Sequence, residues 1–118
     1  MTKSRANECA KIAWLCGLQN ARAEQITSLD GKQKWWVCRT DRKFEDIETF
    51  DPFTRDFDAM MVLAKLELSV YPTFSVMHGT VWKCGVPGRP DDFKEGKTTR
   101  AAICACALAI AEAREGKR

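Results

Sequence analysis

Three aspartates, Asp51, Asp56 and Asp58, lie within eight positions of the sequence and are the first candidates for metal binding or acid–base chemistry. A hard cation needs several oxygen ligands that converge on one point. Asp56 and Asp58 stand two positions apart at the start of a predicted helix, where their side chains diverge by about 200° around the helix axis. We therefore expect these carboxylates to shape a turn and a helix N-terminus, and we predict no metal ligands here.

His78 and Cys84 are the one Cys–His pair that is close in the sequence. Nucleophilic catalysis needs an activated thiolate and a site that stabilises the oxyanion. A hairpin turn is predicted at His78-Gly79, and Cys84 then lies several residues beyond the cross-strand partner of His78. We predict no catalytic residues and expect a protein that is not an enzyme.

A glycine-bearing loop that ends in "GKTT" precedes a predicted helix. A P-loop requires GxxxxGK[ST], and Asp91 stands where the first glycine belongs. A helix N-terminus with neighbouring cations still attracts anions. Lys97, Thr98, Thr99 and Arg100 therefore support an alternative hypothesis, in which the protein binds a nucleotide or a nucleic acid.

The run "KQKWWVCRT" interleaves tryptophan with basic residues on a predicted strand. Trp35 and Trp36 point to opposite faces of such a strand, so one should enter the core and the other should stay partly exposed. Aromatic residues and arginine are enriched in protein interfaces. We predict that Trp35, Trp36 and Arg39, together with Arg89 in the loop 85–97, contact a protein partner.

The charge balance limits the class of partner. A net charge of +3 over 118 residues is too small for the clustered basic surface that is typical of nucleic-acid binding. No apolar run reaches the roughly 18 to 20 residues of a membrane span, and "MTKSRANEC" lacks the apolar core of a signal peptide. We expect a single domain, 1–118, that stays in the cytoplasm and does not bind membranes.

The six cysteines are predicted to be structural. In a protein without a secretion signal, thiols are expected to be reduced and to pack as small apolar side chains. The sequence has no CxxC motif and a single histidine, so the usual zinc spacings are missing. We therefore expect no metal and no cofactor.

Apolar spacing predicts three helices, over about 6–16, 56–66 and 100–114. The last one is rich in alanine, which permits close approach to a sheet. In the middle helix a stripe of apolar residues is expected to face the core, comprising Phe57, Met60, Met61, Ala64 and Leu68.

Strands are predicted between the helices. Asp30-Gly31 is a strong hairpin signal, and further strands are expected at 68–72, 73–77 and 80–84. The order α-ββ-α-ββ(β)-α indicates an α+β fold, with an antiparallel sheet of about 4–5 strands and three helices in an α/β/α layered sandwich.

The stretch "FDPFTRDFDAMMVLAKLELSV" resembles the hallmark of the phage ABA sandwich domain, a family of small phage and prophage proteins. The resemblance is carried by Asp51-Pro52, by the D-x-D-A motif at 56–59 and by the leucine-rich end of the helix. The last helix, "GKTTRAAICACALAIAEA", is similar to the closing helix of that family. The resemblance implies an α/β/α layered fold and a phage or prophage origin, and it implies no catalytic residues.

These observations favour a small, non-enzymatic, phage-encoded protein that binds a host or anti-phage-defence component in an infected or lysogenic bacterium. An anti-CRISPR-like inhibitor is one concrete form. The step from phage origin to host binding rests on association with the family. Homodimerisation is left open.

Overall fold

The computed structural model describes residues 2–18, 21–27, 29–39, 48–89 and 92–115. Within these ranges, only the backbone is described at six strand positions, which are Ile26, Trp36, Cys38, Arg39, Glu48 and Thr49. The chain divides into two compact units, an N-terminal unit, Met1–Asp51, and a C-terminal unit, Pro52–Arg118.

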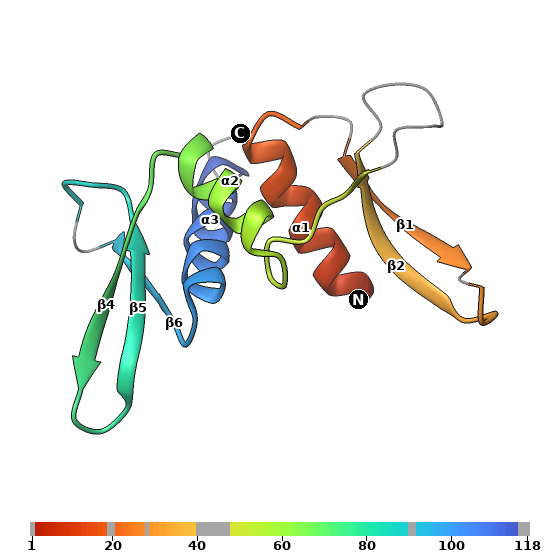
Figure 1. Ribbon diagram of the computed structural model, residues 1–118. Coiled ribbons are helices and arrows are strands. Elements are labelled where there is room, and N and C mark those ends of the chain that lie inside the picture. Colours follow the sequence, from red (N-terminus) through yellow and green to blue (C-terminus); the bar gives the residue numbers. More distant parts are fainter. Residues whose placement is uncertain (1, 19–20, 28, 40–47, 90–91, 116–118) are drawn as a thin grey trace. The chain divides into compact units, whose positions relative to one another are not determined.

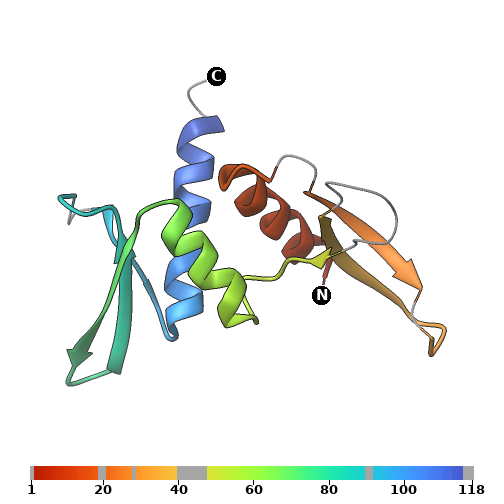
Figure 2. The ribbon, with the colours of Figure 1, turned by 45° about the horizontal axis from the view of Figure 1, so that its top comes forward.

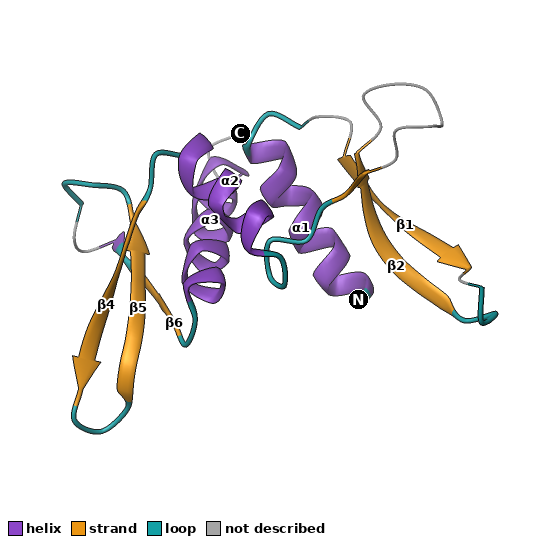
Figure 3. Ribbon diagram, in the orientation of Figure 1, coloured by secondary structure: helices purple, strands orange, loops and turns teal. Residues whose placement is uncertain are grey.

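The elements alternate between helices and antiparallel strands (Figure 1). In chain order they are α1 (Lys3–Leu15), β1 (Ala21–Thr27), β2 (Gln33–Arg39), β3 (Glu48–Thr49), α2 (Asp56–Lys65), β4 (Ser69–Ser75), β5 (Gly79–Gly85), β6 (Lys94–Gly96) and α3 (Thr99–Glu115). The predicted α+β class and the predicted alternation of helices and hairpins are therefore confirmed (Figure 3).

The strands form two sheets, with the orders β1-β2-β3 and β4-β5-β6, where the sequence predicted one sheet of four or five strands. All pairings are antiparallel, as predicted. Each sheet packs against a helix of its own unit, β1 and β2 against α1, and β4 to β6 against α3. Because a helix packs on each sheet separately, two small sheets can each bury an apolar face without merging into one larger sheet.

In the N-terminal unit, the β1–β2 hairpin turns at Asp30-Gly31, as the sequence predicted. Gly31 has a φ of 80°, which L side chains rarely adopt. The Asp30 carboxylate accepts a hydrogen bond from the backbone N–H of Lys32 (3.0 Å), so the aspartate stabilises its own turn.

Helix α1 begins at Lys3, earlier than predicted, and Thr2 is its N-cap. The Thr2 hydroxyl accepts the backbone N–H of Arg5 (3.1 Å). Trp14 is half exposed. Its indole N–H donates to the Ala21 carbonyl (2.6 Å) and so ties the helix to the first residue of β1.

In the C-terminal unit, β4 runs straight through Pro72, where the sequence predicted two separate strands. Proline has no N–H to donate, but β4 is an outer strand of its sheet, and proline is tolerated there. Strand β6 was predicted to be loop. It forms because Lys94, Glu95 and Gly96 pair with β5, so tertiary pairing overrides a low strand propensity.

Helix α3 is the most buried element of the C-terminal unit. Its buried side chains are small or medium in size and comprise Ala102, Ile103, Cys104, Cys106, Ala107 and Ala111. Gly96 lies directly against the start of the helix, where an added Cβ would lie 2.8 Å from the carbonyl carbon of Ala101. The sheet therefore approaches α3 at a distance that only glycine permits.

Helix α2 buries Asp58, Ala59 and Val62. The predicted core stripe was wrong for Phe57 and Met60, which are 78% and 53% exposed, and for Ala64, which is exposed as well. The helix packs against α3, whose surface is built from small residues, and close packing between helices favours short side chains at the contact. The apolar spacing alone could not identify which side of α2 this neighbour occupies.

Candidate functional site

The three aspartates do not form a site together. Asp51 belongs to the N-terminal unit, where its carboxylate accepts a long hydrogen bond from the Cys9 thiol (3.9 Å). Asp56 and Asp58 both stand in the first turn of α2, as predicted. Their side chains have different environments, since Asp56 is exposed whereas Asp58 is buried and 3.8 Å from the guanidinium of Arg55.

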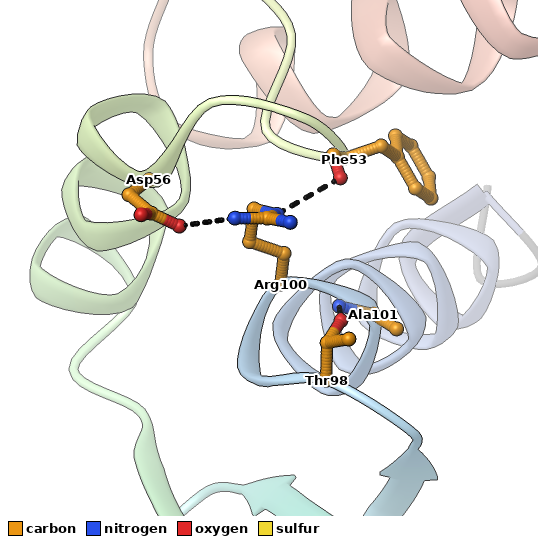
Figure 4. A network of polar contacts seen from close by, with 5 residues as sticks. All are labelled: Phe53, Asp56, Thr98, Arg100 and Ala101. Atoms are coloured by element: carbon orange, nitrogen blue, oxygen red, sulfur yellow. Dashed lines mark hydrogen bonds and ion pairs between the residues drawn. The ribbon is translucent and has the colours of Figure 1, made fainter.

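Asp56 and Arg100 form a short ion pair in the C-terminal unit (Figure 4). The Arg100 Nη1 donates to the Asp56 carboxylate at 2.6 Å, and its Nε donates to the Phe53 carbonyl at 3.2 Å. One guanidinium thereby joins the start of α3 to the turn before α2 and to the first turn of α2. This contact explains why Asp56 does not cap α2, whose N-cap is Arg55 without a side-chain bond.

The predicted phosphate site at the start of α3 is therefore partly occupied by the protein itself. Thr98 caps the helix, its hydroxyl accepting the backbone N–H of Ala101 (3.1 Å), and Arg100 is held by Asp56. Lys97 is exposed and Thr99 is half-buried as the first residue of the helix. Two of the four predicted residues, Thr98 and Arg100, are thus engaged by other groups of the protein. Their engagement weakens the nucleotide hypothesis.

The predicted partner-binding residues lie in both units. Trp35 is half-buried on β2, with the Lys3 ammonium 5.7 Å from its ring centroid, a cation–π distance. The side chains of Trp36 and Arg39 lie outside the described residues. Arg89 is exposed in the loop after β5, where its backbone N–H donates to the Val86 carbonyl. Trp35 therefore belongs to the N-terminal unit and Arg89 to the C-terminal unit.

His78 and Cys84 do not form a catalytic pair. His78 is exposed in the turn between β4 and β5, and Cys84 is fully buried near the other end of β5. Cys84 lies opposite Val70 on β4, five positions along that strand from Ser75, where the turn begins. The sequence reasoning on this pair agrees with the geometry.

The nearest partner of Cys84 is instead another thiol, Cys106 on α3. The Cys84 thiol donates a hydrogen bond to the Cys106 sulfur, and this bond together with burial raises the pKa of Cys84. Accepting the same bond lowers the pKa of Cys106, against the opposing effect of burial and with a smaller contribution from the Lys94 ammonium. The two cysteines thus differ in their tendency to ionise.

The most conspicuous surface of the C-terminal unit is the far end of the β4–β5 hairpin. The hairpin extends well beyond the part of its sheet that lies against α3, as two views show (Figures 1 and 2). Its exposed apolar side chains are Phe74 (78% exposed), Val76 (94%) and Met77 (87%). We call these three residues the hairpin tip.

The hairpin tip belongs to a long uncharged segment. No Asp, Glu, Lys or Arg occurs between Glu67 and Lys83. The hairpin is nevertheless well ordered by its own contacts. Seven residue pairs join β4 to β5, and the Thr73 hydroxyl donates to the Val81 carbonyl (3.1 Å). A rigid strand pair therefore presents apolar side chains to solvent.

The base of the hairpin is fixed by an aromatic contact. The rings of Tyr71 and Phe93 lie 5.5 Å apart at an angle of 49°, within the range of favourable aromatic pairs. The Phe93 ring also covers Gly85, where a side chain would collide with it. These contacts set the position of the tip relative to its own sheet.

This surface was not predicted from the sequence, because Phe74, Val76 and Met77 lie in a run that is typical of an ordinary strand. Two features of the sequence could have indicated an exposed apolar surface. They are the long uncharged segment and the His78-Gly79 turn, which places the three apolar residues beside a loop. Hairpin ends are normally polar, so an apolar end is the observation that stands out.

Among the described residues, no group of three or more His, Cys, Asp or Glu side chains is arranged to hold a metal ion. None of the helices in the described part of the chain has the length and apolar character that crossing a bilayer requires.

Comparisons with known protein families, with curated proteins and with solved structures found no match to this chain. The resemblance to the phage ABA sandwich domain therefore stays a prediction.

Proposed function

We propose that this chain is a non-enzymatic binding protein, and that the hairpin tip is its contact with a partner protein. The observation that carries the proposal is the exposure of Phe74, Val76 and Met77 on an ordered hairpin. Exposed apolar residues gathered in one place are typical of interaction sites, and aromatic residues and methionine are enriched in protein interfaces.

The charge of the hairpin supports a protein partner over a nucleic acid. Binding to nucleic acids relies on lysine and arginine that neutralise phosphates, and the segment between Glu67 and Lys83 has neither. At the start of α3, Arg100 is bound to Asp56 and the Thr98 hydroxyl caps the helix. Both observations weigh against the nucleotide or nucleic-acid alternative.

The family resemblance gives the proposal a concrete form. A small phage-encoded protein that binds a host or defence component, such as an anti-CRISPR-like inhibitor, acts by occupying a surface of its target, and it needs a rigid contact rather than a catalytic group. The hairpin tip is suited to insertion into an apolar pocket of such a target. The predicted contacts of Trp35, Trp36, Arg39 and Arg89 remain part of this hypothesis.

A capture experiment tests the location of the contact. The wild-type chain and a Phe74→Ser/Met77→Ser variant are immobilised and exposed to nuclease-treated bacterial lysate, and bound proteins are identified by mass spectrometry. We expect a partner that the wild type retains in high salt and that the variant loses, because apolar contacts are not screened by salt. Lys97→Ala is the matched control and should retain the partner.

Equal retention of the partner by the wild type and the hairpin variant would refute the role of the tip. Loss of the partner on Lys97→Ala, together with release by moderate salt, would instead favour the phosphate-binding alternative. For the anti-defence form, expression in a bacterium with an active CRISPR system should raise phage plaque numbers, and the hairpin variant should not. Unchanged plaque numbers with the wild type, across several such systems, would contradict it.

A further inference from the structure

Strand β4 is an outer strand whose free edge carries no charge. It stands at the end of the order β4-β5-β6, so one side of its backbone has no neighbouring strand in the sheet. A free edge is a template on which another chain can add a strand, and proteins commonly prevent this with charged side chains, very short strands or proline. No charged residue occurs between Glu67 and Lys83, so charge does not protect this edge.

The other outer strands are protected by charge or by their short length. Strand β1 contains Arg22 and Glu24. Strand β3 has only two residues, and β6 has three residues, which include the charged Lys94 and Glu95. Strand β4 has seven residues and no charge, and it is the one strand among those described that contains a proline. The proline therefore occurs at the edge where the other protections are missing.

The register shows to which side the backbone of Pro72 points. In an antiparallel pair, alternate residues direct their backbone groups towards the neighbouring strand, and the residues between them direct theirs away from it. Pro72 lies within the β4–β5 ladder and has no N–H to donate, so Tyr71 and Thr73 make the bonds to β5. The backbone groups of Val70, Pro72 and Phe74 are therefore directed to the free edge.

We propose that Pro72 prevents a second copy of this chain from adding a strand to the free edge of β4. A symmetric antiparallel pair of two β4 strands would place Pro72 opposite its own copy, and Val70 opposite the partner's Phe74. The central pair would then lack both N–H groups, and the pyrrolidine rings would occupy the space where those hydrogens belong. The carbonyls of this pair would be buried without donors, which disfavours association.

Side chains remain the means of contact at this hairpin. Phe74, Val76 and Met77 are exposed at its end, and they can contact a protein surface without backbone pairing. This statement about the hairpin tip rests on the proposed function. The role of Pro72 does not, because it concerns the backbone of β4 and needs no other protein.

Replacing the proline tests the inference on the purified full-length chain alone. Pro72→Thr supplies the missing N–H and a more polar side chain, so stronger self-association cannot come from added apolar surface. Sedimentation velocity over a range of protein concentrations measures the association constant. We expect the constant of Pro72→Thr to exceed that of the wild type by at least about tenfold, because the central pair gains both of its hydrogen bonds.

Amide hydrogen exchange, followed residue by residue by NMR, shows where two chains meet. The backbone N–H groups of Val70 and Phe74 should exchange fast in the wild type and should become protected in the associated Pro72→Thr variant. Those of Tyr71 and Thr73 are bonded to β5 and should be protected in both proteins. This pattern distinguishes strand addition from association through side chains.

Thr80→Val is the matched control. It adds an apolar, β-branched side chain at an exposed position of the inner strand β5 but no N–H at the edge, so it should associate as the wild type does. A folded Pro72→Thr variant that associates no more than the wild type, or a control that associates as strongly as Pro72→Thr, would overturn the proposal. If Pro72→Thr does not fold, the wild type decides. Fast exchange at Val70 and Phe74 supports the proposal, and protection of these amides overturns it.

Discussion

Helices α2 and α3 pack against each other in the C-terminal unit, and both bury small or medium side chains although their compositions differ. α3 buries mostly alanine and cysteine. α2 has the larger apolar side chains, but it leaves Phe57 and Met60 in solvent and buries Asp58, Ala59 and Val62. In this unit the buried face of a helix is the one that can approach its neighbours closely. The total hydrophobicity of a face does not decide whether it is buried.

The two helices also differ in what surrounds them. α3 contacts all three strands of its sheet as well as α2, so short side chains on several faces are buried at once. The described contacts of α2 within the unit are mainly with α3. A helix such as α2, with one contact stripe, is buried on one side only. Substitutions in α3, which is buried on several sides, should therefore lower the free energy of unfolding more than substitutions in α2.

The largest expected effect is at Ile103, which is fully buried in α3. Ile103→Ala should lower the free energy of unfolding by about 3 kcal/mol, because it removes buried methylene groups and leaves a cavity. Urea denaturation followed by circular dichroism measures the change. Leu108→Ala, at a half-buried position of the same helix, is the control and should cost clearly less. Equal losses at the two positions would contradict the burial assigned to α3.

The close approach of the sheet to α3 is tested at Gly96. An added Cβ would press on the backbone of Ala101 and Ala102, which cannot rotate away as a side chain can. Gly96→Ala should therefore lower the free energy of unfolding by roughly 1–3 kcal/mol. The neighbouring Lys97→Ala variant should leave it unchanged to within about 0.5 kcal/mol. A neutral Gly96→Ala variant would show that the two elements do not touch there.

The polar link between the two helices should contribute less. Arg100→Ala removes both the ion pair to Asp56 and the bond to the Phe53 carbonyl, and we expect a loss of about 1 kcal/mol. Because the Asp56 side chain is 80% exposed, the pair itself is screened by solvent, and a double-mutant cycle with Asp56→Asn should give a coupling of only ~0.2–1 kcal/mol.

The cycle also has an internal check. The coupling between Arg100 and Asp56 should shrink in 1 M salt, where the Debye length falls to about 3 Å, while the bond to the carbonyl remains. A coupling of zero at low salt would indicate that the carboxylate and the guanidinium do not interact in solution.

The smallest effect is expected at the exposed apolar residues of α2. Phe57→Ala and Met60→Ala should each change the free energy of unfolding by less than about 0.5 kcal/mol, because both side chains are largely solvated in the folded chain. The same denaturation measurement applies. A loss of 2 kcal/mol or more at Met60 would restore the sequence-based prediction that this stripe faces the core.

The sequence predicted the local structure of this chain well, because local chemistry determines it. Asp30-Gly31 and His78-Gly79 do form hairpin turns, with a positive φ at both glycines. Gly17, which follows the end of α1, also has a positive φ. Each of these positions depends on a backbone conformation that glycine adopts more readily than other residues.

Features that depend on distant neighbours could not be predicted. The pairing of Lys94–Gly96 with β5 and the contact from Arg100 to Asp56 each join residues that are far apart in the sequence. The burial of Asp58 depends on how α2 packs within its unit. Nothing in the local pattern distinguishes a charged loop from a short outer strand. The hairpin tip could have been suspected from its lack of charge, but its exposure became evident only with the packing of the sheet.

The position of α3 in the chain has a consequence for synthesis. Strands β4 to β6 are translated first, and the helix that covers them follows over Thr99–Glu115. At 5–20 residues per second, the ribosome takes roughly 1 to 4 s to add this helix. Until that helix is complete, strands β4 to β6 lack the cover that α3 gives them in the folded unit, so the packing of the C-terminal unit can be completed only after its last helix has been made.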